Sequence, residues 1–162
     1  MGFFCTVRKR WFQSEVILLK VELPNEVQDL CLALLQGLND VLGEKLHGLY
    51  IYGAVAFPEG GATGDVDFHV ILNGALIDEE KARLKVLHAA LGGELDGYYI
   101  LLEDARQTSL PAHQWLEGVI DGSWALHRAH ILAGRCFVLH GPDPAEVFPP
   151  ATWPELADAL QG

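Results

Sequence analysis

The sequence predicts an α/β (α+β) fold in which a mixed β-sheet is flanked by helices. Amphipathic stretches with helical spacing alternate with short runs of β-favouring residues, a pattern typical of a sheet covered by helices. Two of these runs are joined by a glycine-rich segment, and the second opens with Asp65 and Asp67. The chain has 162 residues, 50% of them hydrophobic, which suits one domain. We therefore expect one domain over residues 24–162, preceded by an N-terminal arm over residues 1–23.

The arm contains a basic cluster, Arg8-Lys9-Arg10, flanked by aromatic residues. Three basic residues are too few to outweigh a chain whose formal net charge is −11, so a nucleic-acid-binding or partner-binding arm is the weaker interpretation. An extra edge strand around Val16–Val21, or a loosely ordered tail, is favoured. A strand here would be able to pair with a second subunit.

From Pro24 onward, periodicity and helix signals place the elements in order. Pro24 suits the first turn of a helix, and Gly43 and Gly92-Gly93 suit the ends of two helices. The expected helices cover residues 24–42, 78–91, 111–134 (divided near Gly118 and Gly122) and 153–160. The expected strands cover residues 49–52, 66–72, 98–102 and 136–139.

The carboxylates at the start of the 66–72 strand are the first candidate site. Side chains alternate along a strand, so Asp65, Asp67 and His69 share one face and the apolar residues between them face the core. We expect both carboxylates to point to solvent together. Two neighbouring like charges favour a bound divalent cation, and Mg²⁺ prefers one or two carboxylates plus substrate phosphates. Asp pairs at strand ends also occur as solvated caps, which is the alternative.

The segment before this pair completes a recognisable pattern. Gly53 ends an apolar strand and allows a tight turn whose backbone amides can approach a phosphate. An apolar strand, Gly53-Ala54, eleven residues and then Asp65-Val66-Asp67 resembles the nucleotidyltransferase superfamily. Within it the sequence is most similar to the nucleotidyltransferase domain of the aminoglycoside (streptomycin/spectinomycin) adenylyltransferases, over roughly residues 25–160. The resemblance implies that Gly53 and Ala54 contact the nucleotide and that Asp65 and Asp67 hold Mg²⁺, with ATP as substrate.

A third carboxylate is needed to take the proton of an attacking hydroxyl. In the resembling family an acidic residue at the start of the third strand has this role, and Asp96 matches that position by its offset from the apolar run 98–102. Glu94 is the reserve candidate, and Glu103-Asp104 is interpreted as a solvated strand end. Asp96 also precedes a glycine, so a plain turn is the alternative.

The resemblance implies transfer of a nucleoside monophosphate, AMP from ATP, to a hydroxyl of a small molecule such as an aminoglycoside. The family's serine is Ala54 here, and this departure favours an alternative, a non-catalytic binding or oligomerisation module of the same fold. A second alternative resembles the antitoxin-type nucleotidyltransferases that modify a partner toxin. The helical domain that completes the acceptor pocket in the antibiotic-modifying relatives is not in this sequence, so the acceptor site is expected to be absent or supplied by another subunit, as in a homodimer.

The composition limits the kinds of partner that the protein is expected to bind. The acidic charge and a pI near 4.9 argue against nucleic-acid and anionic-membrane binding. No apolar run approaches the roughly 20 residues that span a bilayer, and three widely spaced cysteines suggest neither disulfides nor zinc, so a cytoplasmic protein is expected. His127 and His130 are interpreted as packing or exposed residues rather than a metal pair, and Arg128 and Arg135 as candidate phosphate contacts.

Overall fold

The computed structural model describes residues 4–8, 18–57, 65–115 and 123–161. The helices are α1 (Asn25–Leu42), α2 (Asp78–Leu91), α3 (Leu102–Ala105), α4 (Trp124–Leu132) and α5 (Trp153–Gln161). The strands are β1 (Phe4–Arg8), β2 (Leu18–Glu22), β3 (Leu46–Tyr52), β4 (Val66–Leu72), β5 (Leu95–Leu101) and β6 (Phe137–His140). Single 3₁₀ turns are η1 (Gly43–Lys45), η2 (Ala54–Ala56) and η3 (Pro144–Glu146).

A mixed four-stranded sheet in the order β5-β4-β3-β6 forms the centre of the fold. Strand β3 runs antiparallel to both β4 and β6, whereas β4 and β5 are parallel. The parallel pair is joined through α2, as a parallel connection requires. The expected mixed sheet flanked by helices is confirmed.

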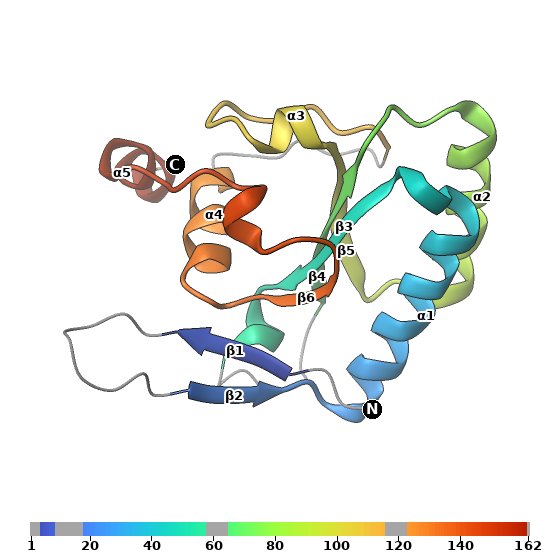
Figure 1. The fold of residues 1–162 in the computed structure, drawn as a ribbon, viewed down its shortest axis with the longest axis horizontal. Coiled ribbons are helices and arrows are strands. Elements are labelled where there is room, and N and C mark those ends of the chain that lie inside the picture. Colours follow the sequence, from blue (N-terminus) through green and yellow to red (C-terminus); the bar gives the residue numbers. More distant parts are fainter. Residues whose placement is uncertain (1–3, 9–17, 58–64, 116–122, 162) are drawn as a thin grey trace.

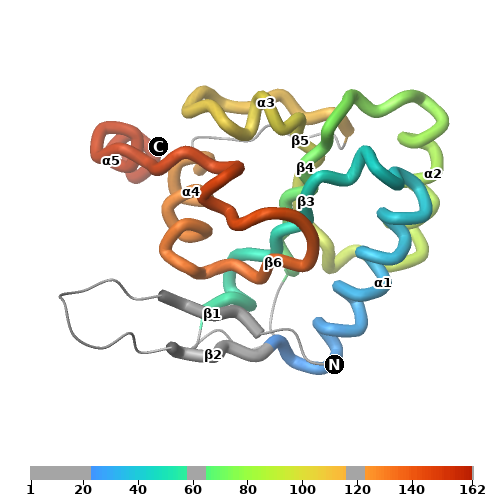
Figure 2. Tube along the Cα trace, viewed as in Figure 1, coloured from blue at the N-terminus to red at the C-terminus, as the bar shows by residue number. Residues whose placement is uncertain are grey.

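Helices cover both faces of this sheet. Helices α1 and α2 lie side by side on one face, and α4 lies on the other (Figures 1 and 2). Under α1 and α2 lies a large apolar core to which Phe68 and Val70 of β4 belong. The opposite face packs Tyr50, Ile71 and Trp124 into a second cluster. The sheet is therefore buried on both sides.

This second cluster corrects the expected solvent face of β4. His69 lies on the same face as Asp67 and is fully buried, 0% exposed. Only the beginning of the strand reaches solvent, where Asp67 is partly exposed and Asp65 is exposed. The alternation was predicted correctly, but the cover provided by α4 follows from no local pattern.

Several boundaries match the sequence pattern. Helix α2 and strand β4 have the expected bounds. Helix α1 begins one residue after Pro24 and ends at Leu42, just before Gly43, whose φ is +54°. Strand β5 begins at Leu95, three residues earlier than expected, so Asp96 lies within the strand.

Two expectations about secondary structure are wrong. Residues 111–115 are not helical, and His113 instead bridges to Ile100, while residues 116–122 lie outside the described part of the chain. Glu103-Asp104 belong to the short helix α3 rather than to a strand end. The strand expected in the arm is present as β2, which pairs antiparallel with β1 in a two-stranded sheet of their own rather than at an edge of the main sheet. Residues 16 and 17 of the expected strand are outside the described residues.

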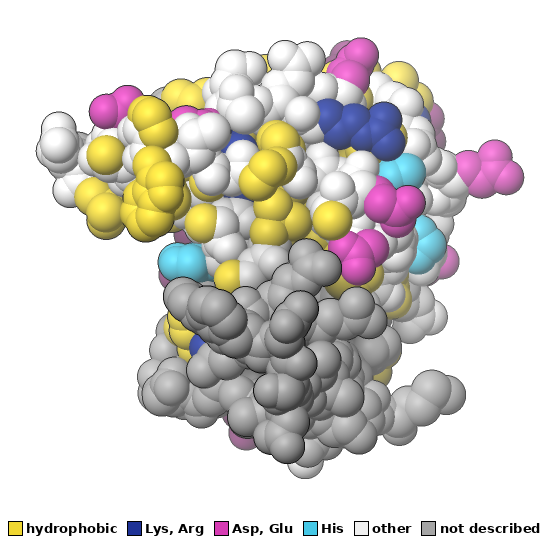
Figure 3. Space-filling view, turned by 60° about the vertical axis from the view of Figure 1, so that its left-hand side comes forward, with side chains coloured by type: hydrophobic (Ala, Val, Ile, Leu, Met, Phe, Trp, Pro, Cys, Tyr) yellow, Lys and Arg dark blue, Asp and Glu magenta, His cyan; other side chains and the backbone are white. Residues whose placement is uncertain are grey.

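Helix α5 is held to α4 by one buried cation. Arg128, 0% exposed, donates through Nη2 to Glu155 Oε1 at 2.5 Å and through Nη1 to the carbonyl oxygens of Pro149 and Pro150. Two apolar side chains of α5, Trp153 and Leu160, are 85% and 76% exposed, and hydrophobic side chains gather on part of the surface in Figure 3. Among the described helices, none combines the length and hydropathy that a membrane crossing requires.

Candidate active site

Three strand ends meet at one edge of the sheet. Strand β3 ends there at Tyr52, and the parallel strands β4 and β5 begin there. Asp67 pairs in register with Tyr52 on one side and with Asp96 on the other. Register partners on adjacent strands project from the same face, so the two carboxylates are neighbours.

A cavity of about 350 Å³ opens at this edge. Its lining comes from β3, β4, β5 and the turn after β3, and from α4 and the residue before it. The lining residues are Tyr52, Gly53, Asp67, Asp96, Tyr98, Ser123, His127 and His130. Two carboxylates, two phenols, a hydroxyl and two imidazoles thus face one space.

Gly53 is required by the close approach of the turn to Asp67. Its φ of +81° lies in a region that residues with a side chain disfavour, and a Cβ atom on Gly53 would collide with Oδ2 of Asp67. The 3₁₀ turn η2 follows, with the Ala56 amide donating to the Gly53 carbonyl at 3.0 Å. The backbone of this turn therefore lies directly against the carboxylate of β4.

Asp67 occupies an electrostatically unfavourable position. Burial, then the negative charges of Asp96 and Asp65, raise the pKa of its carboxyl from 3.8 to about 6. Burial, followed by the charge of Asp67, also raises the pKa of the Tyr52 phenol, which stays protonated. The described residues of the site therefore concentrate negative charge around Asp67.

This donor set fits a hard divalent cation. Carboxylate oxygens are the ligands that Mg²⁺ prefers, and a bound cation would offset the burial and the repulsion from Asp96 and Asp65 that raise the pKa of Asp67. Within the described ranges, no group of three or more His, Cys, Asp or Glu side chains is arranged to hold a metal by itself. The arrangement is a half-site of the kind that Mg²⁺ completes with substrate phosphates and water.

Aromatic rings lie beside and beneath the carboxylates. Tyr52 stacks on His69, with ring centroids 4.6 Å apart and planes 17° apart, and His127 lies 4.9 Å from Tyr52. Neither ring nitrogen of His69 has a hydrogen-bond partner in the described structure, and burial, then His127, lowers its pKa well below 6.5. His69 is therefore neutral and acts as packing beneath the cavity.

The site residues expected from the sequence separate into two groups. Gly53, Asp67 and Asp96 are brought together at the cavity. Asp65 is exposed and near enough to raise the pKa of Asp67, and Ala54 is exposed in η2, but neither lines the cavity.

The reserve and basic candidates are placed differently. Glu94 is exposed beside β5, and only its carbonyl oxygen contacts β4, accepting from Val66. The prediction that Arg128 contacts a phosphate is wrong, because this side chain is fully buried against α5. Arg135 lies with its guanidinium 5.0 Å from the ring centre of Phe57, outside the cavity lining.

Sequence reasoning missed the contribution of Tyr52, Tyr98 and Ser123. The sequence held a signal for the two tyrosines. Tyr98 lies two residues after Asp96, so the two side chains share one face of the strand, and Tyr52 immediately precedes Gly53. His127 and His130 do line the cavity, rather than only packing or facing solvent. No local pattern indicated Ser123.

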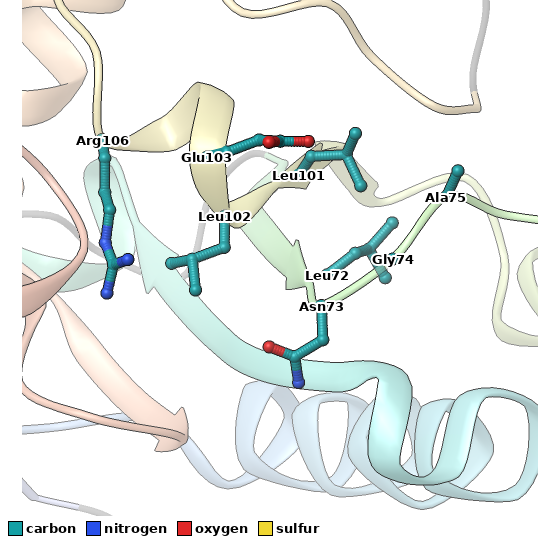
Figure 4. Close-up of a pocket in the computed structure, with 8 residues that line it drawn as sticks. All are labelled: Leu72, Asn73, Gly74, Ala75, Leu101, Leu102, Glu103 and Arg106. Atoms are coloured by element: carbon teal, nitrogen blue, oxygen red, sulfur yellow. The ribbon is translucent and has the colours of Figure 1, made fainter.

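A second cavity, of about 320 Å³, lies at the opposite ends of β4 and β5. Figure 4 shows Leu102 between the side chains of Arg106 and Asn73, with Glu103 turned away from them. This cavity combines no neighbouring carboxylates and lies far along the strands from Asp67 and Asp96. The first cavity is the better candidate for chemistry.

Comparison with known proteins identifies the fold. The chain matches no protein-family model and no curated protein sequence. Among solved structures it is similar to the spectinomycin adenyltransferase AAD(9) from Enterococcus faecialis, solved with ATP and spectinomycin, at a TM-score of 0.67 and 14% identity. The match covers 82% of this chain and 64% of that one, so this chain spans under two thirds of that enzyme. At this identity the match shows the nucleotidyltransferase fold that the sequence resemblance implied.

Two further matches are to toxin–antitoxin structures. One is a tri-AMPylated Shewanella oneidensis HEPN toxin in complex with the MNT antitoxin, at 14% identity and a TM-score of 0.41, covering 83% of each chain. The other is a toxin–antitoxin with AMP-PNP, at 15% identity and a TM-score of 0.42, covering 80% of this chain and 82% of that one. Both TM-scores are too low for us to draw conclusions from them.

Proposed function

We propose that this chain, which has the nucleotidyltransferase fold, transfers a nucleoside monophosphate, AMP from ATP, to a hydroxyl group of a small molecule such as an aminoglycoside. The observation that carries the proposal is the register pairing of Asp67 with Asp96, beside Gly53, at a cavity on one edge of the sheet. Neighbouring carboxylates at a tight glycine turn are what a metal-assisted phosphoryl site needs.

In this proposal Asp65 and Asp67 hold Mg²⁺, which when bound neutralises charge on the triphosphate. Gly53 and Ala54 place backbone against the phosphates without a side chain large enough to obstruct them. The raised pKa of Asp67, about 6, leaves it ionised above neutral pH and available as a ligand.

Asp96 acts as the general base. Its carboxylate takes the proton of the acceptor hydroxyl as that oxygen bonds to the α-phosphorus. The bond from the α-phosphorus to the bridging oxygen breaks, and pyrophosphate leaves with the electron pair. Asp96 and Asp67 project from the same face, so base and metal ligand would address the same phosphoryl group.

The partners follow from this chemistry. We propose a nucleoside triphosphate as the first substrate, an acceptor bound partly by a second subunit in a homodimer, and a cytoplasmic setting. The acidic cavity wall suits a cationic acceptor. Light scattering after size-exclusion chromatography measures the oligomeric state directly.

Ala54 favours one rival, a non-catalytic module of the same fold, because this residue offers no hydroxyl to a phosphate. An antitoxin-type enzyme that modifies a partner protein is the other rival. Activity tests with small-molecule hydroxyl acceptors, aminoglycosides first, separate the small-molecule enzyme from both.

Calorimetric titration with ATP, with and without Mg²⁺, tests the proposal. We expect binding that requires Mg²⁺ in the wild type and is lost in Asp67→Asn, whose side chain has the same shape without the charge. Asp158→Asn, an exposed change on α5, is the matched control and should bind like the wild type. A folded wild type that binds no nucleoside triphosphate would count decisively for the non-catalytic module.

A further inference from the structure

Helix α4 contributes a wall to the cavity that the proposed mechanism leaves unused. Ser123 precedes the helix, His127 lies one turn later, and both line the same space as Gly53, Asp67 and Asp96. The side chains of these two residues are linked, because Ser123 Oγ and His127 Nε2 form a hydrogen bond of 3.0 Å. Linked polar groups from α4 and the residue before it therefore line the same cavity as the carboxylates.

The imidazole of His127 is fixed at both nitrogens. Its Nδ1 forms a hydrogen bond of 3.3 Å with the hydroxyl of Tyr52, and its Nε2 bonds to Ser123. Hydroxyl groups both donate and accept, so either neutral tautomer satisfies the two contacts. The ring also packs 5.5 Å from the fully buried His69. Tyr52 thus anchors His127 to the sheet, and His127 anchors Ser123.

A structural role for Ser123 is the natural competing interpretation. Serine before a helix usually caps it, by accepting a hydrogen bond from an amide of the first turn. Ser123 occupies the cap position of α4, yet no side-chain hydrogen bond caps the helix there. The hydroxyl is instead held at the cavity wall by His127.

From these contacts we infer that Ser123 is a nucleotide-binding residue, whose hydroxyl contacts a phosphate oxygen of the bound nucleoside triphosphate, with His127 and Tyr52 as its positioning residues. The inference rests on the proposed function. A phosphate is the fitting partner, because the metal half-site on the carboxylates of this cavity places phosphates within this space. The hydroxyl provides a contact that does not depend on the metal.

The test is calorimetric titration of Ser123→Ala and Ser123→Thr with Mg²⁺ and ATP. We expect Ser123→Ala to weaken ATP binding about tenfold, as the loss of one hydrogen bond to a charged group does. Ser123→Thr keeps the hydroxyl and should stay within about threefold of the wild type. Ser109→Ala, an exposed serine outside both cavity linings, is the matched control.

Ligand fragments locate the contact. Inorganic tripolyphosphate with Mg²⁺ should show the same loss in Ser123→Ala as ATP does, whereas adenosine should show none. An equal loss with adenosine would place the hydroxyl on the nucleoside and overturn the inference.

The positioning role predicts non-additivity. His127→Phe keeps an aromatic ring in the stack but cannot orient the serine, so it should weaken binding by several-fold. The double variant with Ser123→Ala should bind no more weakly than Ser123→Ala alone, because the two side chains act through one contact. Additive losses would contradict the positioning role, and melting temperatures of all variants check that they fold.

The outcomes separate this inference from the proposed function. If ATP binding is lost in Asp67→Asn but unchanged in Ser123→Ala, the inference about Ser123 is wrong and the proposed function stands. A folded wild type that binds neither ATP nor tripolyphosphate overturns both.

Discussion

Replacing Asp67 by Asn should stabilise the metal-free protein, although it removes a residue of the proposed site. The pKa of the Asp67 carboxyl rises from 3.8 to about 6 on folding, through burial and then repulsion from Asp96 and Asp65. At about 1.4 kcal/mol per pKa unit, ionising Asp67 costs the folded state about 3 kcal/mol. The amide of Asn has the same shape and carries no charge. The variant therefore gains up to this amount.

The direction of the pKa shift defines the pH range over which Asp67 changes the stability of the protein. Below pH 3.8 Asp67 is protonated in both states and adds no pH dependence. Between pH 3.8 and about 6 the folded state binds more protons than the unfolded state, so wild-type stability falls as pH rises. Above this window the loss is complete and constant.

Thermal unfolding in EDTA at low salt, from pH 3.5 to 8, measures the effect. For a chain of this size about 1 kcal/mol shifts the melting temperature by about 2–4 °C, so the variant should exceed the wild type by up to about 6–12 °C at pH 8. The two should converge near pH 3.5. Excess Mg²⁺ should raise the wild-type melting temperature and narrow the gap at pH 8, because it binds the ionised carboxylate.

A difference that is absent or negative at pH 8 would refute the reasoning. It would mean that Asp67 is compensated in the folded protein and that the cavity edge is not a region of concentrated negative charge. Asp158→Asn, which removes an exposed carboxylate on α5, should show no comparable gain in the same series.

Three further changes test other parts of the structure. Gly53→Ala should cost about 1–3 kcal/mol and abolish nucleotide binding, because it combines a positive φ with a collision against the carboxylate of β4; Gly92→Ala, with positive φ but open space around it, isolates the backbone part in urea unfolding. Arg128→Ala should lower the free energy of unfolding by about 3 kcal/mol or more in the same assay, because Glu155 and two carbonyl groups lose their buried donor. A loss under about 1 kcal/mol would contradict the role of Arg128 in holding α5 to α4. Trp153→Ala should change stability by less than about 0.5 kcal/mol because the side chain is 85% exposed, and a larger loss at high protein concentration alone would indicate that a second copy covers α5.

Local patterns predicted many of the elements well. Strand β4 and helix α2 have the expected bounds because alternation, helical spacing and terminal glycines act over a few residues. The same logic failed over residues 111–115, where apolar spacing suggested a helix but His113 pairs with Ile100 in a bridge. A short apolar run does not distinguish the two, since the choice depends on what the segment packs against.

The candidate site was predicted in part. The structure brings Gly53, Asp67 and Asp96 to one cavity. Gly53 and Asp67 were chosen because they flank apolar strands, and Asp96 because of its offset from the next apolar run and the family resemblance. Arg128 was misjudged because a buried ion pair and an exposed phosphate contact look the same in a sequence. Only the position of Glu155 on α5 decides between them.

By itself the sequence determined the half of the site that depends on short-range geometry. A glycine after an apolar strand and carboxylates at alternating positions define a turn and a charged strand end wherever the strands lie. The tertiary structure alone decided that β4 and β5 pair in the register that joins Asp67 to Asp96, and that α4 and Ser123 line the same cavity. Register and helix docking are determined by burial on both faces of the sheet, a property of the whole chain that no local window contains.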